Sequence, residues 1–398
     1  MATGAPELRS RRSLLPNLLL AGVSLLVAGL VCEGLARLYI HRREGGPGTT
    51  GYPLARYDPD LGWSKPPGGE AIIQRSEYRV RLQINAHGLR GPDRPYGKPP
   101  GVRRVLLLGD SITEGYSVEE PYTLRSVLEA LLNSRREGRF EVINAGTAGY
   151  STDQEYLFYT GEGVRYQPDV VVLLFCYNDL YPSLGGEGGK PYFDVVDGRL
   201  ALRNVPVPRE QVGRDVRRRY VIRPWRGSYA LRLLSNRTLA GNPELHAFLS
   251  RIGLVEPFVE QSPPPEMWPY GLGHRDEVVE MWRRVEAVID ALDDEVERRQ
   301  ERLVLFYVPA GFEQNDRAWE LTRRRYHMGP RWNRDRVFED LAAVAIRRRL
   351  TIVDPRPSFR EAEASGQRTY FPEDGHWNEV GNRLAARCLD GVVASKDY

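Results

Sequence analysis

Short, mostly apolar segments that alternate with amphipathic stretches constrain the fold of this chain more than any other sequence feature. The apolar segments lie at residues 105–108, 140–143, 170–175, 303–308 and 350–353. Runs of this length are typical of strands buried on both faces. Apolar residues recur at helical spacing over residues 124–132, 278–296 and 384–392. This alternation predicts parallel βαβ units, and hence an α/β fold whose parallel sheet is covered by helices on both faces.

A separate apolar segment, residues 14–40, predicts a transmembrane anchor, because roughly 20 apolar residues suffice to cross a bilayer as a helix. Arg9, Arg11 and Arg12 precede it. This fits a cytoplasmic N-terminus at residues 1–13 and a main domain that is periplasmic or extracellular. Basic residues also follow the segment, so charge alone leaves the orientation open. A cleaved signal peptide is the main alternative and a buried helix the remaining one, but no small-x-small cleavage pattern closes the apolar run. We therefore expect a single-pass membrane protein.

The rest of the chain divides into a linker, an extension and a main domain. Residues 41–56 are charged and Gly-rich, as a linker would be. Residues 57–101 form an N-terminal extension, with a strand predicted over 78–84 and a turn over 85–88. Residues 102–398 form the main domain. Within it, about 180–274 is too long for one crossover and is interpreted as an insertion, lying over one end of the sheet and shaping substrate access.

Two features of the insertion have a structural and a functional interpretation. Trp225, Trp268 and Tyr270 can stack on sugars, although packing is the commoner role of these residue types. Six arginines lie between residues 214 and 226. We interpret them as a solvated face, with contact to anionic lipid or an acidic glycan as the alternative.

Charge and cysteine content exclude several classes of function. The chain has 56 basic and 53 acidic residues, a net charge of +3 that gives no reason to expect a nucleic-acid partner. Its 3 cysteines are too few for a disulfide framework. The 6 histidines are scattered without metal-ligand spacing, and no phosphate-binding or dinucleotide-binding glycine motif is present. We expect no metal and no cofactor, and the sequence is silent on protein partners.

A serine follows the first buried strand of the main domain. The segment is GDSITEG, residues 109–115, with Ser111 at its centre. In doubly wound sheets the carboxyl end of a strand lies on the ligand-binding side. Ser111 is therefore a candidate nucleophile, and the alternative is a strand-to-helix turn with a serine cap.

A histidine follows the last strand, in the segment FPEDGHWN at residues 371–378. His376 can act as a general base if a carboxylate orients its imidazole ring. Two carboxylates, Glu373 and Asp374, lie within three positions of it. The alternative is an ordinary loop histidine.

Two further polar turns follow the second and third strands. The first is NAGTAG, residues 144–149, and the second is CYND, residues 176–179. A glycine N–H and an asparagine amide there can both donate to the oxyanion of a tetrahedral intermediate. Each segment alone is an ordinary turn. Four polar segments that meet at one sheet edge nevertheless favour a catalytic site.

These four segments, in this order, resemble the SGNH superfamily of hydrolases, also called the GDSL family. The resemblance implies a flavodoxin-like, three-layer α/β/α fold with Ser111 as nucleophile and His376 as base. It further implies an oxyanion hole from the Ser111 N–H, the Gly149 N–H and the Asn178 side chain, with Asp110 supporting. The segment NAHGLRG, residues 85–91, resembles the lead-in of membrane-anchored bacterial members.

The chain departs from the family pattern at two positions. Cys176 stands where the third block usually begins with glycine. The last block usually places its aspartate three residues before the histidine, where this chain has Glu373. Asp374, two before His376, gives the Asp-x-His-Trp spacing of alginate-type O-acetyltransferases. We favour Asp374 as the third member of the triad, with Glu373 as the alternative.

The expected function is serine-dependent hydrolysis of O-acyl groups, with O-acetyl favoured. The expected substrate is an acylated small molecule or polysaccharide, favoured as a cell-envelope or exported carbohydrate, and the intermediate is an acyl-enzyme on Ser111. One alternative is an O-acyltransferase that moves the acetyl group to a polysaccharide hydroxyl. The other is a catalytically silent, membrane-anchored binding or assembly protein, in which Ser111 would be buried or blocked.

Overall fold

The computed structural model describes residues 14–44, 54–135, 138–185, 189–212, 228–231, 234, 245, 248–249, 251–252, 263–273 and 275–395. The chain forms two compact units: Met1–Gly48 with Val221–Phe258, and Thr49–Tyr220 with Val259–Tyr398. The predicted N-terminus at 1–13 and the arginines at 214–226 lie outside the described residues. So does most of the predicted linker.

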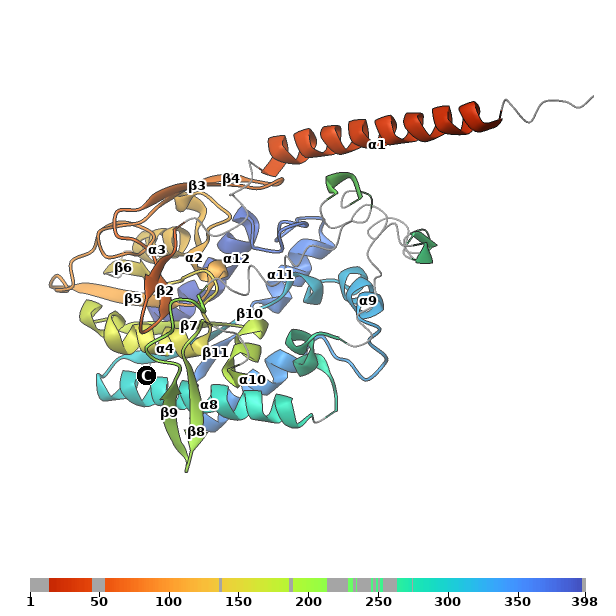
Figure 1. The fold of residues 1–398 in the computed structure, drawn as a ribbon. Helices are drawn as coiled ribbons and strands as arrows, with labels where there is room; N and C mark the ends of the chain where they lie inside the picture. The colour runs from red at the N-terminus through yellow and green to blue at the C-terminus, as the bar shows by residue number, and fades with distance from the viewer. Residues whose placement is uncertain are drawn as a thin grey trace, which may run out of the picture. The chain divides into compact units, whose positions relative to one another are not determined.

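A five-stranded parallel sheet forms the centre of the larger unit (Figure 1). Its strands, in order across the sheet, are β11 (Thr351–Val353), β10 (Arg302–Val308), β7 (Val170–Cys176), β5 (Val102–Leu108) and β6 (Arg139–Asn144). If the five strands are numbered along the chain, the order from the β6 edge is 2-1-3-4-5. This is the flavodoxin arrangement. The predicted fold class is confirmed, and all five strands lie where the apolar segments placed them.

Helices cover both faces of this sheet, because alternate strand residues point to opposite sides. Val105 and Leu107 belong to the core on one face, whereas Leu106 and Leu108 belong to the core on the other. The first face is packed by α3 (Leu124–Ser134), α11 (Arg356–Ala364) and α12 (Glu379–Ala394). The second is packed by α4 (Thr152–Gly161), α8 (Asp276–Arg298) and α10 (Arg336–Arg348). The predicted three-layer arrangement is therefore observed.

Shorter helices connect these layers. They are α2 (Ser111–Glu114), α9 (Asp316–Arg325) and the 3₁₀ helices η2 (Glu120–Tyr122), η3 (Gly163–Tyr166), η4 (Tyr177–Asp179), η5 (Tyr181–Leu184), η7 (Pro265–Tyr270) and η8 (Gly311–Glu313).

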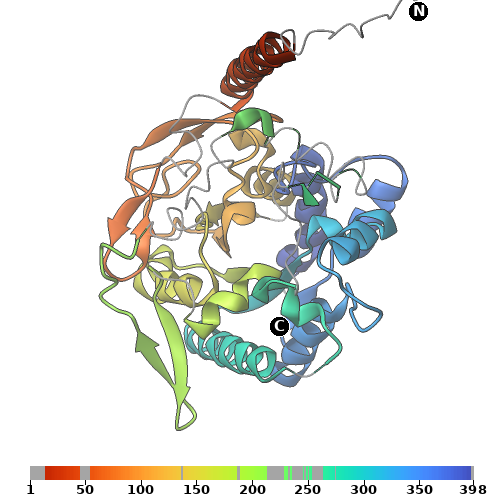
Figure 2. The same cartoon turned by 45° about the vertical axis from the view of Figure 1, so that its right-hand side comes forward.

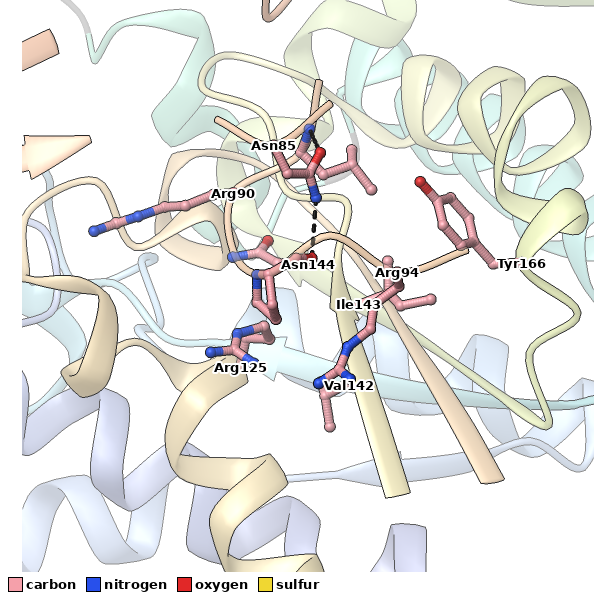
Figure 3. Close-up of a pocket in the computed structure, with 10 residues that line it drawn as sticks. Asn85, Arg90, Arg94, Arg125, Val142, Ile143, Asn144 and Tyr166 are labelled. Atoms are coloured by element: carbon pink, nitrogen blue, oxygen red, sulfur yellow. Dashed lines mark hydrogen bonds between the residues drawn. The ribbon is translucent and has the colours of Figure 1, made fainter. Parts of the chain in front are cut away.

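The N-terminal extension consists of two hairpins and a loop. The hairpins pair β1 (Arg56–Asp58) with β2 (Gly62–Ser64), and β3 (Glu70–Gln74) with β4 (Arg79–Gln83). The loop after β4 covers a cavity of about 10 Å³, large enough for one water molecule and too small for a substrate (Figure 3). Across the loop, the Asn85 amide donates to the Pro92 carbonyl over 3.2 Å (Figure 3). This hydrogen bond closes the loop after β4 on itself.

The insertion contains a β-hairpin that the sequence analysis did not predict. It pairs β8 (Tyr192–Val196) with β9 (Arg199–Arg203) and lies beside α8 (Figures 1 and 2). Its turn is Asp197-Gly198, with φ of +50° and +73°. Asp-Gly between alternating residues is a strong hairpin signal because both positions take positive φ. The signal was therefore present in the sequence.

The smaller unit contains the predicted anchor. Helix α1 (Leu14–Glu44) extends four residues past the predicted end of that segment. Its stretch Pro16–Tyr39 is long and apolar enough to cross a membrane. The unit also includes described residues of the insertion, of which 229–231, 234, 245, 248–249 and 251 are helical.

Candidate active site

Ser111 is the first residue of α2, directly beyond the carboxyl end of β5. The turn is stabilised by Asp110, whose side chain accepts a hydrogen bond from the Ile112 N–H over 2.8 Å. This bond caps the helix and leaves Ser111 half-buried at the sheet edge. The predicted supporting position of Asp110 thus corresponds to an N-cap.

A connected chain of contacts runs from Ser111 through His376 to Asp374. Ser111 Oγ lies 2.8 Å from His376 Nε2. The other ring nitrogen, Nδ1, lies 2.5 Å from Asp374 Oδ1. The two ends of this chain are 263 residues apart in sequence, and the parallel sheet brings them to the same edge. This arrangement can move a proton from the hydroxyl to the imidazole while the carboxylate holds the ring.

The two candidate carboxylates have different partners. Asp374 contacts His376, whereas Glu373 Oε2 accepts a 2.5 Å hydrogen bond from the Ser76 hydroxyl. Glu77 Oε2 accepts the N–H groups of both residues over 2.9 Å. Ser76 and Glu77 lie in the turn between β3 and β4, so the N-terminal extension holds the loop that carries His376.

Tyr78 and Tyr116 complete the surroundings of the Asp374–His376 pair, and the sequence analysis missed both. Tyr78 Oη donates to Asp374 Oδ2 over 3.0 Å. Tyr116 Oη lies 3.2 Å from His376 Nδ1, and its ring packs edge-on against the imidazole. Tyr78 is 296 positions before Asp374, and no local signal connects them. Only the tertiary fold reveals this contact.

These contacts determine the charge of Asp374. Burial raises the pKa of this carboxyl, but hydrogen bonds from His376 and Tyr78 and the charge of His376 outweigh burial. The net pKa lies below its usual value. Burial is also the main cause that raises the pKa of Tyr116, so its hydroxyl stays protonated. The Asp374 carboxylate is therefore ionised at neutral pH.

Gly149 lies in the turn after β6, with φ of +80°. A Cβ at this position would lie 3.1 Å from Cζ2 of Trp63. The Trp63 indole N–H donates to the Ala148 carbonyl over 3.0 Å. Lys65 also binds the turn, through the Thr147 hydroxyl over 2.9 Å and the Gly146 carbonyl. The extension therefore holds the turn that carries Gly149 as well.

Asn178 lies in η4, beyond the end of β7. Its amide nitrogen is 3.4 Å from Asp110 Oδ2, a long hydrogen bond. Asp179, the next residue, accepts the Cys176 N–H over 2.8 Å and closes this turn. Burial raises the pKa of the Cys176 thiol well above its usual value, so this sulfur is not an ionised nucleophile. Cys176, at the position where the third block usually has glycine, is buried.

The loop 85–91 supports the turn that follows Ser111. Asn85 Oδ1 accepts the N–H groups of His87 and Leu89 over 3.0 and 2.9 Å. The buried Arg90 guanidinium donates to the carbonyls of residues 114, 115 and 118, which follow Ser111. The segment noted for its resemblance to anchored members thus stabilises α2 and the turn after it.

The insertion's aromatic residues have packing roles where the structure describes them. Tyr270 is fully buried, and its hydroxyl donates to Glu313 over 2.5 Å. Trp268 packs against the same core and donates to the Pro263 carbonyl over 2.9 Å. Trp225 lies outside the described residues.

A family model gives the chain its assignment. The model of the GDSL-like lipase/acylhydrolase family matches residues 107–384. The chain belongs to this family. The predicted membership is confirmed, and the matched region of this GDSL-family chain begins just before Ser111. The contacts from Trp63, Lys65, Glu77 and Tyr78 come from outside it.

Other comparisons are weaker. No curated protein matches the chain. A catalytic mutant of the acetylxylan esterase Axe2 from Geobacillus stearothermophilus is 13% identical, with a TM-score of 0.38 over 72% of this chain and 92% of that chain. A lipase/acylhydrolase from Enterococcus faecalis is 16% identical, with a TM-score of 0.38 over 73% and 95%. At these TM-scores the likeness says nothing about the substrate of this chain.

Proposed function

We propose that this protein is a serine ester hydrolase in which Ser111 attacks O-acyl groups, above all O-acetyl groups on a carbohydrate. The observation that supports the proposal best is the continuous contact from Ser111 Oγ through His376 to Asp374, with distances of 2.8 and 2.5 Å. A general base within hydrogen-bond reach of a hydroxyl, itself oriented by a carboxylate, is the requirement for an activated serine.

The reaction proceeds in two halves. His376 Nε2 accepts the Ser111 proton while Oγ bonds to the ester carbonyl carbon, and the carbonyl electrons move to oxygen. The intermediate then collapses, the C–O bond to the alcohol breaks, and His376 returns the proton to the leaving oxygen. Water, deprotonated by His376, attacks the acyl-enzyme in the same way and releases the acid. Asp374 remains ionised throughout and stabilises the imidazolium.

The oxyanion of each tetrahedral intermediate would accept hydrogen bonds from the Ser111 N–H, the Gly149 N–H and the Asn178 amide. The long 3.4 Å bond from Asn178 to Asp110 supports this role, because little is lost when the amide turns to a stronger acceptor. Removing one such donor typically costs on the order of a hundred-fold or more in rate.

The proposed site of action is the cell envelope, with α1 as an uncleaved anchor and the catalytic domain outside the cytoplasm. The apolar stretch Pro16–Tyr39 supports anchoring by its length and composition. The Asp-x-His-Trp spacing at residues 374–377 supports a carbohydrate substrate through its resemblance to alginate-type O-acetyltransferases. The same spacing favours the second candidate, transfer of the acetyl group to a sugar hydroxyl. Hydrolase and transferase share the first half-reaction.

One experiment separates these candidates. The full chain in detergent is given a chromogenic acetyl ester, with and without an oligosaccharide acceptor, beside Ser111→Ala. A hydrolase releases acetate at a rate independent of the acceptor, and a transferase gives acetylated oligosaccharide instead. Equal turnover by wild type and Ser111→Ala would refute both. The silent binding protein predicts no turnover, yet Ser111 is only half-buried and contacts a base.

A further inference from the structure

A carboxylate within the apolar stretch of α1 has all its described partners in this helix and the insertion. Glu33 Oε2 accepts hydrogen bonds from the Ser228 hydroxyl over 2.8 Å and the Ala230 N–H over 3.1 Å. Its Oε1 accepts from the Tyr229 N–H over 3.0 Å and from Arg37 over 2.8 Å. An ionised group in a membrane span is costly unless it is paired. These four bonds remove that cost and attach residues 228–230 to the helix.

The attachment point is close to one end of the span. Glu33 precedes Tyr39, the last residue of the apolar stretch, by six residues, which is about 9 Å along a helix. A hydrocarbon core of about 30 Å centred on this stretch would place Glu33 roughly 7 Å inside its boundary with the headgroups, a depth that a surface-lying amphipathic segment reaches. Two further observations support the attachment of residues 228–230 to α1. Arg37 lies over the Tyr229 ring at 5.5 Å, and Ala36 is buried.

Large apolar side chains are exposed in the same unit. Phe248 is 56% exposed and Ile252 is 53% exposed. The Ile252 N–H donates to the Phe248 carbonyl over 3.2 Å, so the two lie one helical turn apart on the same face. Leu245, one turn earlier, is 42% exposed. Such a stripe is unfavourable in water and favourable in the acyl region of a membrane.

We propose that the insertion lies on the membrane surface beside α1, with Phe248 and Ile252 in lipid and Glu33 as its tether. The proposal rests on the anchoring proposed above and goes beyond it, because it gives the membrane a second contact. The occupant of the apolar stripe is the bilayer that α1 is proposed to cross, because the stripe belongs to the same compact unit as this helix.

Spin labels on the full chain test this directly. Labels are placed at Phe248→Cys, at Leu26→Cys in the span and at Leu321→Cys on α9. Leu26 is 65% exposed and Leu321 is 52% exposed. The background is Cys32→Ser with Cys388→Ser, and the vesicles are 3:1 phosphatidylethanolamine and phosphatidylglycerol. Accessibility to oxygen and to a water-soluble nickel chelate is compared. We expect the label at 248 to prefer oxygen, as at 26, and the label at 321 to prefer nickel.

A label at 248 that behaves like the one at 321 would overturn the proposal. If the label at 26 also prefers nickel, the anchor itself is refuted. Hydrolysis of a soluble acetyl ester is measured on the same variants. Because this activity does not depend on the membrane, its loss would indicate a failure of the proposed function and not of the membrane contacts.

The tether has its own variant. Glu33→Ala should shift the ratio of lipid-contacting to water-exposed label at 248 by about tenfold towards water, because hydrogen bonds to a charged group are lost. Ser24→Ala, on the same helix, serves as the matched control and should leave the ratio unchanged. An unchanged ratio in Glu33→Ala would contradict the role of Glu33.

Discussion

At the residue scale, Glu373 and Asp374 are neighbours with different hydrogen-bond partners. Only Asp374 contacts the imidazole, whereas the Glu373 carboxylate is held by Ser76. We predict that Asp374→Asn lowers kcat on the order of a thousand-fold, because the amide no longer stabilises the imidazolium or its tautomer. Glu373→Gln should stay within about threefold of wild type, in line with its exposed position. Ester hydrolysis measures both, and a larger loss in Glu373→Gln would contradict the assignment.

Tyr78 offers a second prediction, because its hydroxyl donates to Asp374. That bond favours the ionised carboxyl and lowers its pKa, so Tyr78→Phe should raise the pKa of Asp374. Asp374 would then protonate at a higher pH, and activity would be lost earlier on acidification. We expect kcat to fall about tenfold with KM unchanged, since a hydrogen bond to a charged group is lost.

The control for Tyr78 is Tyr57→Phe. Its hydroxyl donates to the Val207 carbonyl over 2.7 Å and touches no catalytic residue. If the pH profiles of the two variants coincide, the role of Tyr78 is structural only.

The sequence narrowed the carboxylate partner of His376 to two residues and favoured Asp374 by its spacing, and the structure shows the contact with Asp374. Ser111, His376, Gly149 and Asn178 each follow a strand, so the rule for parallel sheets placed them at one edge. Tyr78 follows no such rule, because its hairpin belongs to the extension. Its position depends on tertiary packing that a local pattern does not encode.

At the element scale, the turn after β6 must accommodate Gly149 at φ +80° beside the Trp63 ring. Gly149→Ala should destabilise the protein by roughly 1–2 kcal/mol and lower kcat at least about tenfold, because the oxyanion donor is displaced. Gly198→Ala is the matched control. It has φ +73° with nothing within 4 Å of a new Cβ, so it carries the backbone strain alone.

Thermal unfolding and ester hydrolysis of both alanine variants test this difference. Full activity in Gly149→Ala would contradict the proposed oxyanion role of this turn.

Some elements of the fold could be predicted from the sequence, and others could not. Buried parallel strands are continuous apolar runs, so all five were found. The β8–β9 hairpin is half exposed and signalled mainly by its turn, Asp197-Gly198. The docking of Ser228 onto Glu33 joins segments 195 residues apart and had no local signal.

At the scale of the whole molecule, one buried carboxyl links stability to pH. Burial raises the pKa of Glu313 from 4.5 to about 7, despite hydrogen bonds from Tyr270 and Tyr307. Above pH 4.5 the unfolded chain releases this proton while the folded protein keeps it, so rising pH favours unfolding until about pH 7. Between pH 4.5 and 8 the ionisation of Glu313 should lower the free energy of unfolding by about 3 kcal/mol.

Glu313→Gln removes that titration. Urea unfolding should show wild type losing about 3 kcal/mol more than the variant over this pH range. Parallel pH dependence of the two proteins would contradict the raised pKa.

The extension also changes how the whole site is understood. Residues 57–101 lie outside the region 107–384 that matches the family, yet they contact the loops carrying Asp374 and Gly149 and support the helix of Ser111. The region that matches the family therefore contains the proposed triad and the sheet, and the chain's own extension contacts the loops that carry the proposed triad.

The most direct test of the central claim is covalent labelling of the full chain with a fluorophosphonate, followed by peptide mass spectrometry. We predict one modified residue, Ser111, with labelling abolished in Ser111→Ala and slowed on the order of a thousand-fold or more in His376→Ala. A folded wild-type protein that is not labelled, or that is labelled at another serine, would contradict the account.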